Sequence, residues 1–486
     1  SQALTRQNRS EKSALSSADV SVWKGGTGNW NTATNWNPAG VPNSSAAVAL
    51  IDGAPAVASA VTIATGITVG GLTVESGDAV TVANTYSLTV AAGGSLLNNG
   101  TVSILANGSS TYLSFSGRQT LDGTGEVVLS DNSYAILSLT GTDKVLTQAD
   151  GHTIRGSGRL LNNTGDFVNR GTVRATGSVA LTLDPLAFCV NEGVMRAEGS
   201  GGLVLAAAAF TNDGHTIEIL PGSLLTLRSG ATVFAGTLAS SGNGRIVPDG
   251  GSRLNRVSLA PGSLVDQATG TGVTILGGLT NHGTWAVGAA GLTTTITFSG
   301  NQALAGTGEL VFSDSTYGRL MMGASAESLV HEDGHTIRGA GHLLDNTGNL
   351  INRGAIRAQG NNPLELDPTS FVVNEGTLRA EGAGGLEFAA GAYTNAGHVI
   401  EVADGSLLTL RDSAKVVGGN LTTFGTGRIK PLSGSHLIGV TLAPGACVAH
   451  ANGFAVTVSG GLMNHGSWQI GGAGITTTLI FSGDQS

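Results

Sequence analysis

The side chains that could do chemistry in this chain come in pairs, and the two members of each pair differ by 183 in sequence number. A polysaccharide lyase or hydrolase needs at least two carboxylates that converge in a groove. The candidate carboxylates are Asp131/Asp314, Asp150/Asp333, Glu192/Glu375, Glu198/Glu381 and Glu218/Glu401, and the histidines pair as His152/His335, His215/His398 and His282/His465. Because a single active site needs no second copy, this pairing favours a scaffold role. We therefore expect no catalytic residues.

The sequence contains no motif of a common catalytic or metal-binding chemistry. It lacks the Gly-x-Ser-x-Gly elbow, the P-loop, His-Glu-x-x-His and the paired Cys/His spacings of zinc sites. It also lacks an EF-hand loop and the Gly-Gly-x-Gly-x-Asp calcium repeat. We expect no cofactor and no bound metal, with calcium at scattered turn carboxylates as an open alternative.

All of these side chains belong to a long internal repeat with the same offset of 183 residues. The segment Phe115-Ser-Gly-Arg-Gln119 returns as Phe298-Ser-Gly-Asn-Gln302 and again as Phe481-Ser-Gly-Asp-Gln485. The sequence therefore divides into one partial repeat, 56–114, two full repeats, 115–297 and 298–480, and the start of a third, 481–486.

A shorter period lies inside the long one. The pattern Asn-x-Gly-x-apolar-x-apolar begins at Asn98, Asn169, Asn191, Asn212, Asn281, Asn352, Asn374, Asn395 and Asn464, with its glycines at Gly100, Gly171, Gly193, Gly214, Gly283, Gly354, Gly376, Gly397 and Gly466. The spacing from Asn169 through Asn191 to Asn212 predicts a unit of 22–23 residues, with eight such units in each long repeat. Asn suits turns because its side chain bonds nearby backbone groups, and stacked Asn side chains can form a ladder. Gly suits a tight corner that a Cβ would obstruct.

The local pattern between these turns is that of short strands. Apolar and polar residues alternate in segments such as Thr101–Ile104 and Thr293–Phe298, which is the two-residue period of a strand. Leucine-rich repeats and helical arrays share this range of periods but not this pattern. The sequence predicts an all-β fold, a right-handed parallel β-helix of about 22-residue coils. Its stacked coils would form a rod with one continuous core.

The composition excludes several other classes of protein. Gly reaches 76 of 486 residues without a three-residue period, so collagen is excluded. A hydrophobic fraction of 40% argues against a disordered chain. A net charge of −9 and only five lysines argue against a nucleic-acid partner. No apolar run approaches the ~18 residues that span a bilayer, so we expect no membrane insertion.

The N-terminal part differs from the repeats. Residues 1–21 are polar and lack periodicity, so we interpret them as a flexible arm, which in a mature chain would follow a removed signal peptide. Residues 22–55 are rich in Trp and Gly. The tryptophans Trp23, Trp30 and Trp36 predict a cap over the first coil, and a platform for stacking sugars is the alternative.

This Trp-rich segment resembles the opening of large exported bacterial surface and matrix proteins with β-helical repeats, the autotransporter-like and filamentous-haemagglutinin-like adhesins. The resemblance is carried by Trp23, Gly25, Gly26, Trp30, Asn35, Trp36 and Pro42. It implies secretion, a cell-surface or matrix location, and adhesion or scaffolding.

Together these observations predict a non-enzymatic extracellular structural protein. We expect its partner to be a further copy of the same chain, joined head to tail into filaments or a biofilm matrix, because exposed strand edges accept further strands. Extracellular polysaccharide is a second expected partner. The alternatives are a monomeric adhesin stalk that presents a binding tip and, less favoured, a polysaccharide lyase or hydrolase.

Overall fold

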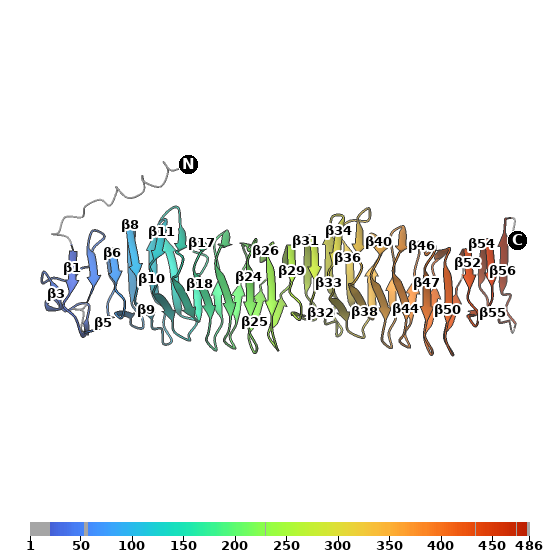
Figure 1. Ribbon diagram of the computed structural model, residues 1–486, viewed down its shortest axis with the longest axis horizontal. Coiled ribbons are helices and arrows are strands. Elements are labelled where there is room, and N and C mark those ends of the chain that lie inside the picture. The colour runs from blue at the N-terminus through green and yellow to red at the C-terminus, as the bar shows by residue number, and fades with distance from the viewer. Residues whose placement is uncertain (1–19, 53–56, 229, 433, 473, 484–486) are drawn as a thin grey trace, which may run out of the picture. The chain divides into compact units, whose positions relative to one another are not determined.

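The fold is a parallel β-solenoid, as the sequence predicts. A computed structural model describes residues 20–52, 57–228, 230–432, 434–472 and 474–483. It is all-β, about 1% helical, with about 19 turns that have a ~22-residue spacing. The chain divides into two compact units, residues 1–203 and 204–486, and Figure 1 shows the strands of both. The arm predicted for 1–21 lies outside the described residues, apart from Val20 and Ser21.

In the first unit three strands make one turn, so the strands form three columns, each paired with the turns before and after it. The first column contains β1 (Val20–Trp23), β4 (Val48–Ile51), the second halves of β6 (Ile67–Val74) and β8 (Ser87–Asn98), β11 (Gln119–Asp122), β14 (Val145–Gln148), β17 (Asp166–Asn169) and β20 (Phe188–Asn191). The second contains β2 (Thr27–Asn29), β5 (Ala60–Ile63), β7 (Ala79–Val82), β9 (Thr101–Ile104), β12 (Glu126–Leu129), β15 (Thr153–Gly156), β18 (Thr172–Ala175) and β21 (Val194–Ala197). The third contains the first halves of β6 and β8, then β10 (Thr111–Ser116), β13 (Ala135–Thr140), β16 (Gly158–Leu161) and β19 (Leu181–Leu183). The 3-10 helix η1 (Ala33–Asn35) and β3 (Trp36–Asn37) stand outside the columns, and β22 (Leu203–Leu205) lies where the two units join in sequence.

The second unit has the same three-column plan. Its first column contains β23 (Ala209–Thr211), β26 (Thr232–Phe234), the first halves of β29 (Ser252–Leu259) and β31 (Gly272–Asn281), β33 (Thr294–Ser299), β36 (Gly318–Met322), β39 (Gly341–Leu344), β42 (Leu364–Leu366), β45 (Leu386–Phe388), β48 (Leu407–Leu410), β51 (Arg428–Pro431), β53 (Cys447–His450) and β55 (Ser467–Ile470). Its second contains β24 (Thr216–Ile219), β27 (Thr237–Ser240), the second halves of β29 and β31, β34 (Gln302–Ala305), β37 (Ser328–His331), β40 (Asn349–Asn352), β43 (Phe371–Asn374), β46 (Ala392–Thr394), β49 (Lys415–Val417), the first halves of β52 (His436–Leu442) and β54 (Ala455–Asn464), and β56 (Thr478–Ser482). Its third contains β25 (Leu224–Leu227), β28 (Arg245–Pro248), β30 (Leu264–Gln267), β32 (Thr284–Val287), β35 (Glu309–Phe312), β38 (Thr336–Gly339), β41 (Ala355–Ala358), β44 (Thr377–Ala380), β47 (Val399–Val402), β50 (Asn420–Thr423) and the second halves of β52 and β54.

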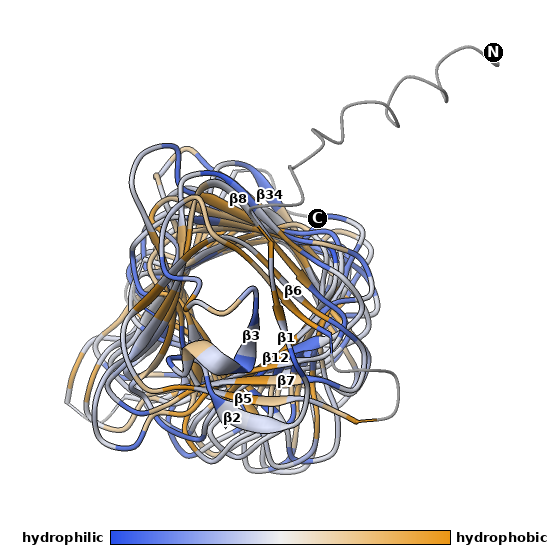
Figure 2. Ribbon diagram, turned by 90° about the vertical axis from the view of Figure 1, so that its left-hand side faces the viewer, coloured by the Kyte–Doolittle hydropathy of each residue, from blue (hydrophilic) through white to orange (hydrophobic). Residues whose placement is uncertain are grey.

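The alternating sequence pattern builds the core directly. Along β12, Val127 and Leu129 are buried while the residues before each of them are partly exposed, and most four-residue strands repeat this order. Since successive side chains of a strand point to opposite faces, every second residue faces inward in each turn. Figure 2 shows the strands largely in hydrophobic colours and the loops outside them largely in hydrophilic ones. Each turn thus buries its apolar side only by stacking on its neighbours.

Turn length varies, while strand register stays constant. Ala60 pairs with Ala79 across a short turn, whereas Glu126 pairs with Thr153 across a turn that is longer by eight positions. The extra residues lie in the loops between strands, because a loop tolerates added length at little cost whereas a shifted register would turn apolar side chains outward.

The sequence period predicts that each long repeat fills eight turns. In the structure the repeat covers eight turns and one additional face of the solenoid. In the second unit, eight successive pairings lead from Thr284 in β32 to Met463 in β54. The residue equivalent to Thr284, however, is Ser467, which lies in β55 on the next column. Residues that are equivalent by sequence in this unit therefore lie on neighbouring faces of the solenoid.

Candidate functional site

The repeated asparagines lie inside the solenoid, at the end of a strand. Eight of the nine are buried with exposed fractions of 3% or less, namely Asn98, Asn169, Asn191, Asn212, Asn281, Asn352, Asn374 and Asn395. Asn464 is exposed. A buried amide needs hydrogen-bond partners, because an unpaired one bears the full free-energy cost of leaving water.

In the first unit these partners come from neighbouring turns. The Asn169 amide donates to Asn191 Oδ1 at 2.7 Å, and the Asn98 amide lies 3.1 Å from His152 Nε2. Between these two pairs stands Gln148, whose amide donates to His152 O at 2.7 Å. The polar ladder of this unit therefore consists of separate side-chain pairs.

In the second unit the ladder is continuous, because His331 occupies the position of Gln148. His331 Nδ1 lies 2.7 Å from Asn352 Oδ1, and His331 Nε2 lies 3.0 Å from His335 Nδ1. His335 Nε2 then lies 3.1 Å from the amide of Asn281. Beyond Asn352 the amides continue, from Asn352 to Asn374 at 2.8 Å and from Asn374 to Asn395 at 2.7 Å.

This chain fixes the protonation of both histidines. An amide oxygen only accepts, so His331 must donate from Nδ1 to Asn352 Oδ1 and accept at Nε2. His335 must then donate from Nδ1 to His331 and accept at Nε2 from Asn281. A second proton on either ring would place two donors face to face. Burial lowers the pKa of His331 to about 4, and burial with the neighbouring histidine lowers that of His335 to about 3.

The repeated glycines serve close packing of turns at most positions. At Gly100, Gly171, Gly193, Gly283, Gly354, Gly376 and Gly466, a Cβ would overlap a backbone carbonyl oxygen of the preceding turn. Gly214 and Gly397 differ, since each has free space but a positive φ, +73° and +80°, which side chains other than glycine rarely adopt. The same sequence motif thus meets two separate backbone requirements.

The tryptophans form a buried cap at the first turn. The exposed fractions of Trp23, Trp30 and Trp36 are 2% or less, and Trp36 makes edge-on contacts with Trp23 and Trp30 at centroid distances of 5.1 and 4.8 Å. Strand β3 pairs antiparallel with β1, opposite Trp23, and Figure 2 shows it lying across the opening of the first turn. Buried rings offer no face on which a sugar could stack, which favours the predicted cap over the stacking platform.

Seven of the ten paired carboxylates from the sequence are ion-pair partners or loop anchors, namely Asp131, Asp314, Glu192, Glu198, Glu375, Glu381 and Glu401. Glu192 bonds Arg170 at 2.8 Å, and Glu198 bonds Arg174 at 2.7 Å; Glu375 and Glu381 bond Arg353 and Arg357 at 3.0 and 2.7 Å. Asp131 and Asp314 bind backbone N–H groups of a loop two turns further on. Among the described residues, no three or more His, Cys, Asp or Glu side chains are grouped to hold a metal ion, and no helix is long and apolar enough to span a bilayer.

One charged cluster is not apparent from the repeat pattern of the sequence, because it occurs in only one repeat. It lies along β36, β39, β42, β45 and β48 of the second unit and consists of Arg319, His342, Asp345, Glu365, Asp367, Glu387, Arg411 and Asp412. One repeat earlier, Thr182 stands for Glu365 and Val204 stands for Glu387. Comparing the two copies position by position would have revealed it.

Glu365 is the centre of this cluster. It is only 7% exposed, lies 3.0 Å from His342 Nδ1 and also pairs with Arg411. Burial opposes its charge, but the hydrogen bond from His342 and the charge of Arg411 prevail and lower its pKa. The hydrogen bond to Glu365 in turn raises the pKa of His342. Burial and the charge of Glu365 raise the pKa of Asp367.

Glu365 in β42 and Asp367, which follows the end of that strand, have opposite pKa shifts, as an acid and a base would. The same pattern also arises in ion-pair networks that serve stability alone. The cluster is therefore the place in the described chain where an enzymatic alternative would be located.

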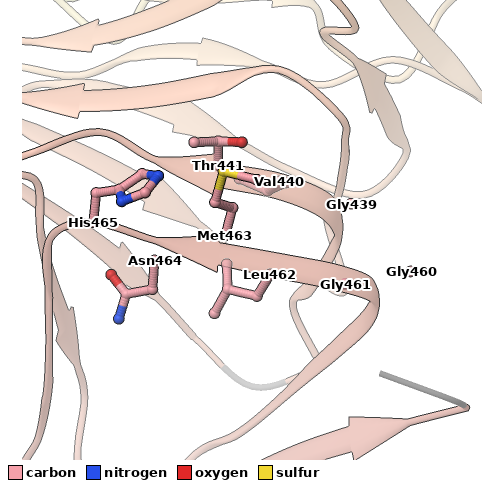
Figure 3. A pocket seen from close by; sticks show the side chains of 9 residues that line it. All are labelled: Gly439, Val440, Thr441, Gly460, Gly461, Leu462, Met463, Asn464 and His465. Atoms are coloured by element: carbon pink, nitrogen blue, oxygen red, sulfur yellow. The ribbon is translucent and has the colours of Figure 1, made fainter. Parts of the chain in front are cut away.

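A hollow of ≈ 440 Å³ lies beside β54, where Leu462–Asn464 face Val440 and Thr441 of β52 (Figure 3). One repeat earlier, β34 covers the equivalent strand, with Leu304 opposite Leu279. Asn464, which lines this hollow and is exposed, belongs to the same series as the buried Asn281.

We predict that Gly376→Ala lowers stability by about 1–3 kcal/mol, because the new Cβ must displace the backbone at Gly354. Gly250→Ala is the matched control, since its Cβ would meet no atom within 4 Å, and its effect should stay within about 0.5 kcal/mol. Chemical denaturation followed by circular dichroism measures both. Equal midpoints for the two variants would contradict the close-packing argument.

We predict that acid destabilises the second unit through His331 and His335. In the unfolded chain the pKa of each histidine is about 6.5. Below that pH the unfolded chain therefore binds protons that the folded chain does not bind. Stability is full above pH 6.5 and falls as the pH drops towards the folded values of about 4 and about 3, by ~3 kcal/mol for His331 and ~5 kcal/mol for His335.

His331→Gln introduces the residue of the first unit and tests this linkage. It should cost about 1 kcal/mol at pH 7 through the lost hydrogen bond but flatten the loss between pH 6.5 and 4. Denaturation at a series of pH values shows the slope. His465→Gln, at an exposed position, should leave the slope unchanged. An unaltered slope in His331→Gln would refute the assignment.

We predict that the imidazole of His342 titrates above its usual range and that Glu365→Gln moves its pKa below that range. The carboxylate favours the charged ring, whereas burial alone opposes it. Glu332→Gln removes a carboxylate that pairs with Arg353 at 3.1 Å and should leave the titration unchanged. NMR of the histidine ring protons against pH reads the values directly, and equal curves in both variants would rule out the contact.

Comparisons with known proteins supply no relative: no protein-family model matches the chain, and neither the curated proteins nor the solved structures contain a match. The adhesin-like resemblance of residues 22–42 accordingly stays an expectation. Function has to be argued from the geometry of the solenoid, its ladders and its surface.

Proposed function

We propose that this chain is an extracellular structural protein whose β-solenoid assembles head to tail into filaments or into a biofilm or cell-surface matrix. The observation that carries the proposal is the repetition of stacking contacts. The bond from Asn169 to Asn191 recurs from Asn352 to Asn374, and the pair of Arg174 with Glu198 recurs as Arg357 with Glu381. What both copies retain is contact between turns, which is the property a scaffold needs.

Parallel pairing of turns also supplies a mechanism of assembly. An uncovered strand edge presents N–H and C=O groups in the register of a further strand, so it accepts one from another molecule. A contact between two different ends does not close on itself, and repeated contacts of this type produce filaments.

The Trp cap favours the second candidate, a monomeric stalk. Strand β3 lies against the edge of β1, so a coil from another molecule would have to displace it before stacking there. Displacement would expose the contacts of Trp36 with Trp23 and Trp30. Secretion and a surface location enter both proposals from the resemblance of residues 22–42.

The enzymatic alternative has one definite location, the charged cluster around Glu365. A polysaccharide lyase or hydrolase would need this carboxylate and Asp367 for proton transfer. Loss of a measured activity on acidic polysaccharides in both Glu365→Gln and Asp367→Asn would support it.

Sedimentation and electron microscopy distinguish filament from stalk. For head-to-tail assembly we expect the weight-average mass to rise with concentration and unbranched filaments to be visible. Trp36→Ala, which opens the cap, provides the comparison. A wild-type chain that stays monomeric at every concentration while Trp36→Ala associates would refute assembly of the natural form and establish the stalk.

A further inference from the structure

One exposed tyrosine stands at the same place in both copies of the repeat. Tyr134 is 46% exposed and Tyr317 is 44% exposed, and each directly precedes a strand, β13 or β36. Other large rings of these copies, such as Trp285 and Phe298, are buried, whereas the exposed Phe424 has Ser241 in its place in the other copy. A ring retained outside the core in both copies serves something other than packing.

An aspartate fixes the loop that carries each tyrosine. Asp131 accepts hydrogen bonds from Ser157 Oγ at 2.7 Å, from Ser178 N and Oγ at 3.0 and 2.6 Å, and from Val179 N at 2.8 Å. These bonds hold its pKa far below the usual range. They tie the loop of residues 130–134 to a loop two turns away, and the carboxylate is fully used by them.

The second copy has the same anchor with different partners. Asp314 accepts from the backbone N–H of Asn361 at 3.0 Å and of Asn362 at 2.8 Å, and from both side-chain amides. These bonds lower its pKa as well. The anchor thus persists although Ser157, Ser178 and Val179 of the first copy are replaced by Ala340, Asn361 and Asn362.

The backbone of each tyrosine is fixed on both sides. Tyr134 N donates to Asn132 Oδ1 at 3.0 Å, and Tyr134 O accepts from Thr111 N at 2.9 Å. Tyr317 N donates to Ser315 Oγ at 3.2 Å, and its carbonyl accepts from Thr294 N at 3.1 Å. A ring on a fixed backbone loses little conformational entropy when a ligand covers it.

The loops of residues 130–134 and 313–317 contain no charged side chain other than Asp131 and Asp314, and Arg319, two residues after Tyr317, pairs with Asp345. The loop of the preceding turn carries an exposed leucine in each unit, Leu105 at 51% and Leu292 at 61%. In the first unit Tyr86, which is 37% exposed, adds a further ring on the same column. Beside the tyrosines in sequence stand hydroxyl and amide side chains, Asn132 and Ser133 or Ser315 and Thr316.

We propose that the Tyr134 and Tyr317 loops are a repeated binding site for a neutral polysaccharide, with the ring stacked on the apolar face of a sugar and the neighbouring hydroxyl and amide groups bonded to its hydroxyls. The partner is neutral because no charged side chain is left unengaged in either loop. The site goes beyond the structural role and does not depend on filament assembly.

The size and spacing of the sites favour a polysaccharide over a protein. A single exposed ring in each loop falls far short of the ~1,000 Å² that a specific protein interface buries, whereas a single sugar matches a single ring. Sites that recur once in every long repeat suit a polymer that repeats the same unit, because linked weak contacts multiply in affinity.

Affinity electrophoresis of the whole chain in gels with hydroxyethylcellulose, galactomannan or dextran tests the proposal. We expect at least one of these neutral polymers to retard the chain, Tyr134→Ala or Tyr317→Ala to weaken binding about tenfold, and the double variant to abolish it. Tyr134→Trp with Tyr317→Trp should restore it, because a larger ring still stacks. Phe424→Ala, at an exposed ring outside the loops, is the matched control.

Three results would overturn the proposal: no retardation by any of the three polymers, equal retardation of the double variant, or loss caused equally by Phe424→Ala. If the double variant instead loses self-association in sedimentation, the tyrosines serve a protein contact and the polysaccharide site is wrong. Unchanged self-association with lost retardation supports the site. A failure of filament formation in the wild-type chain bears only on the proposed structural function.

Discussion

Parallel hydrogen bonding between successive turns is the constraint on which this structure depends. A single turn, with its ~22-residue spacing, has an apolar side and no means of burying it, so each turn becomes stable only when its strands pair with the turns on both sides. Pairing in register places like residues above one another, as Arg155 above Arg174 and Asn169 above Asn191. Every position must therefore be compatible with a similar side chain ~4.8 Å away.

This constraint explains the polar features of the solenoid. Stacked asparagines satisfy it because an amide donates on one side and accepts on the other, whereas stacked arginines need interposed carboxylates. Arg155 and Arg174 lie side by side, and each is neutralised by its own glutamate, Glu126 or Glu198. Histidine enters the ladder only while neutral. The replacement of Gln148 by His331 therefore extends the ladder and adds a sensitivity to acid.

The features on which the functional proposals rest lie where a residue departs from the stacking pattern. The Trp cap breaks it with an antiparallel strand, the cluster around Glu365 breaks it by occurring in one copy, and Tyr134 and Tyr317 break it by leaving the core. One long repeat covers eight turns and one further column of strands. Residues of the second unit that are one repeat apart therefore lie on neighbouring faces of the solenoid. A side chain that is repeated along the sequence of this unit is thus presented on successive faces of the solenoid.

The sequence by itself determined the fold class, the short period of the coils and the stacked asparagines, because alternation, turn residues and internal identity are local properties of the chain. It also indicated that Trp23, Trp30 and Trp36 form a cap. Only the tertiary structure showed that these rings are buried, that the repeat spans eight turns and a face, and that Glu365 meets His342 and Arg411. These facts depend on loop lengths that vary from turn to turn, which decide which residues of distant turns become neighbours. The strand register repeats the local sequence pattern from turn to turn. Contacts between residues of different turns determine which ion pairs form, how the pKa values shift and which side chains are exposed.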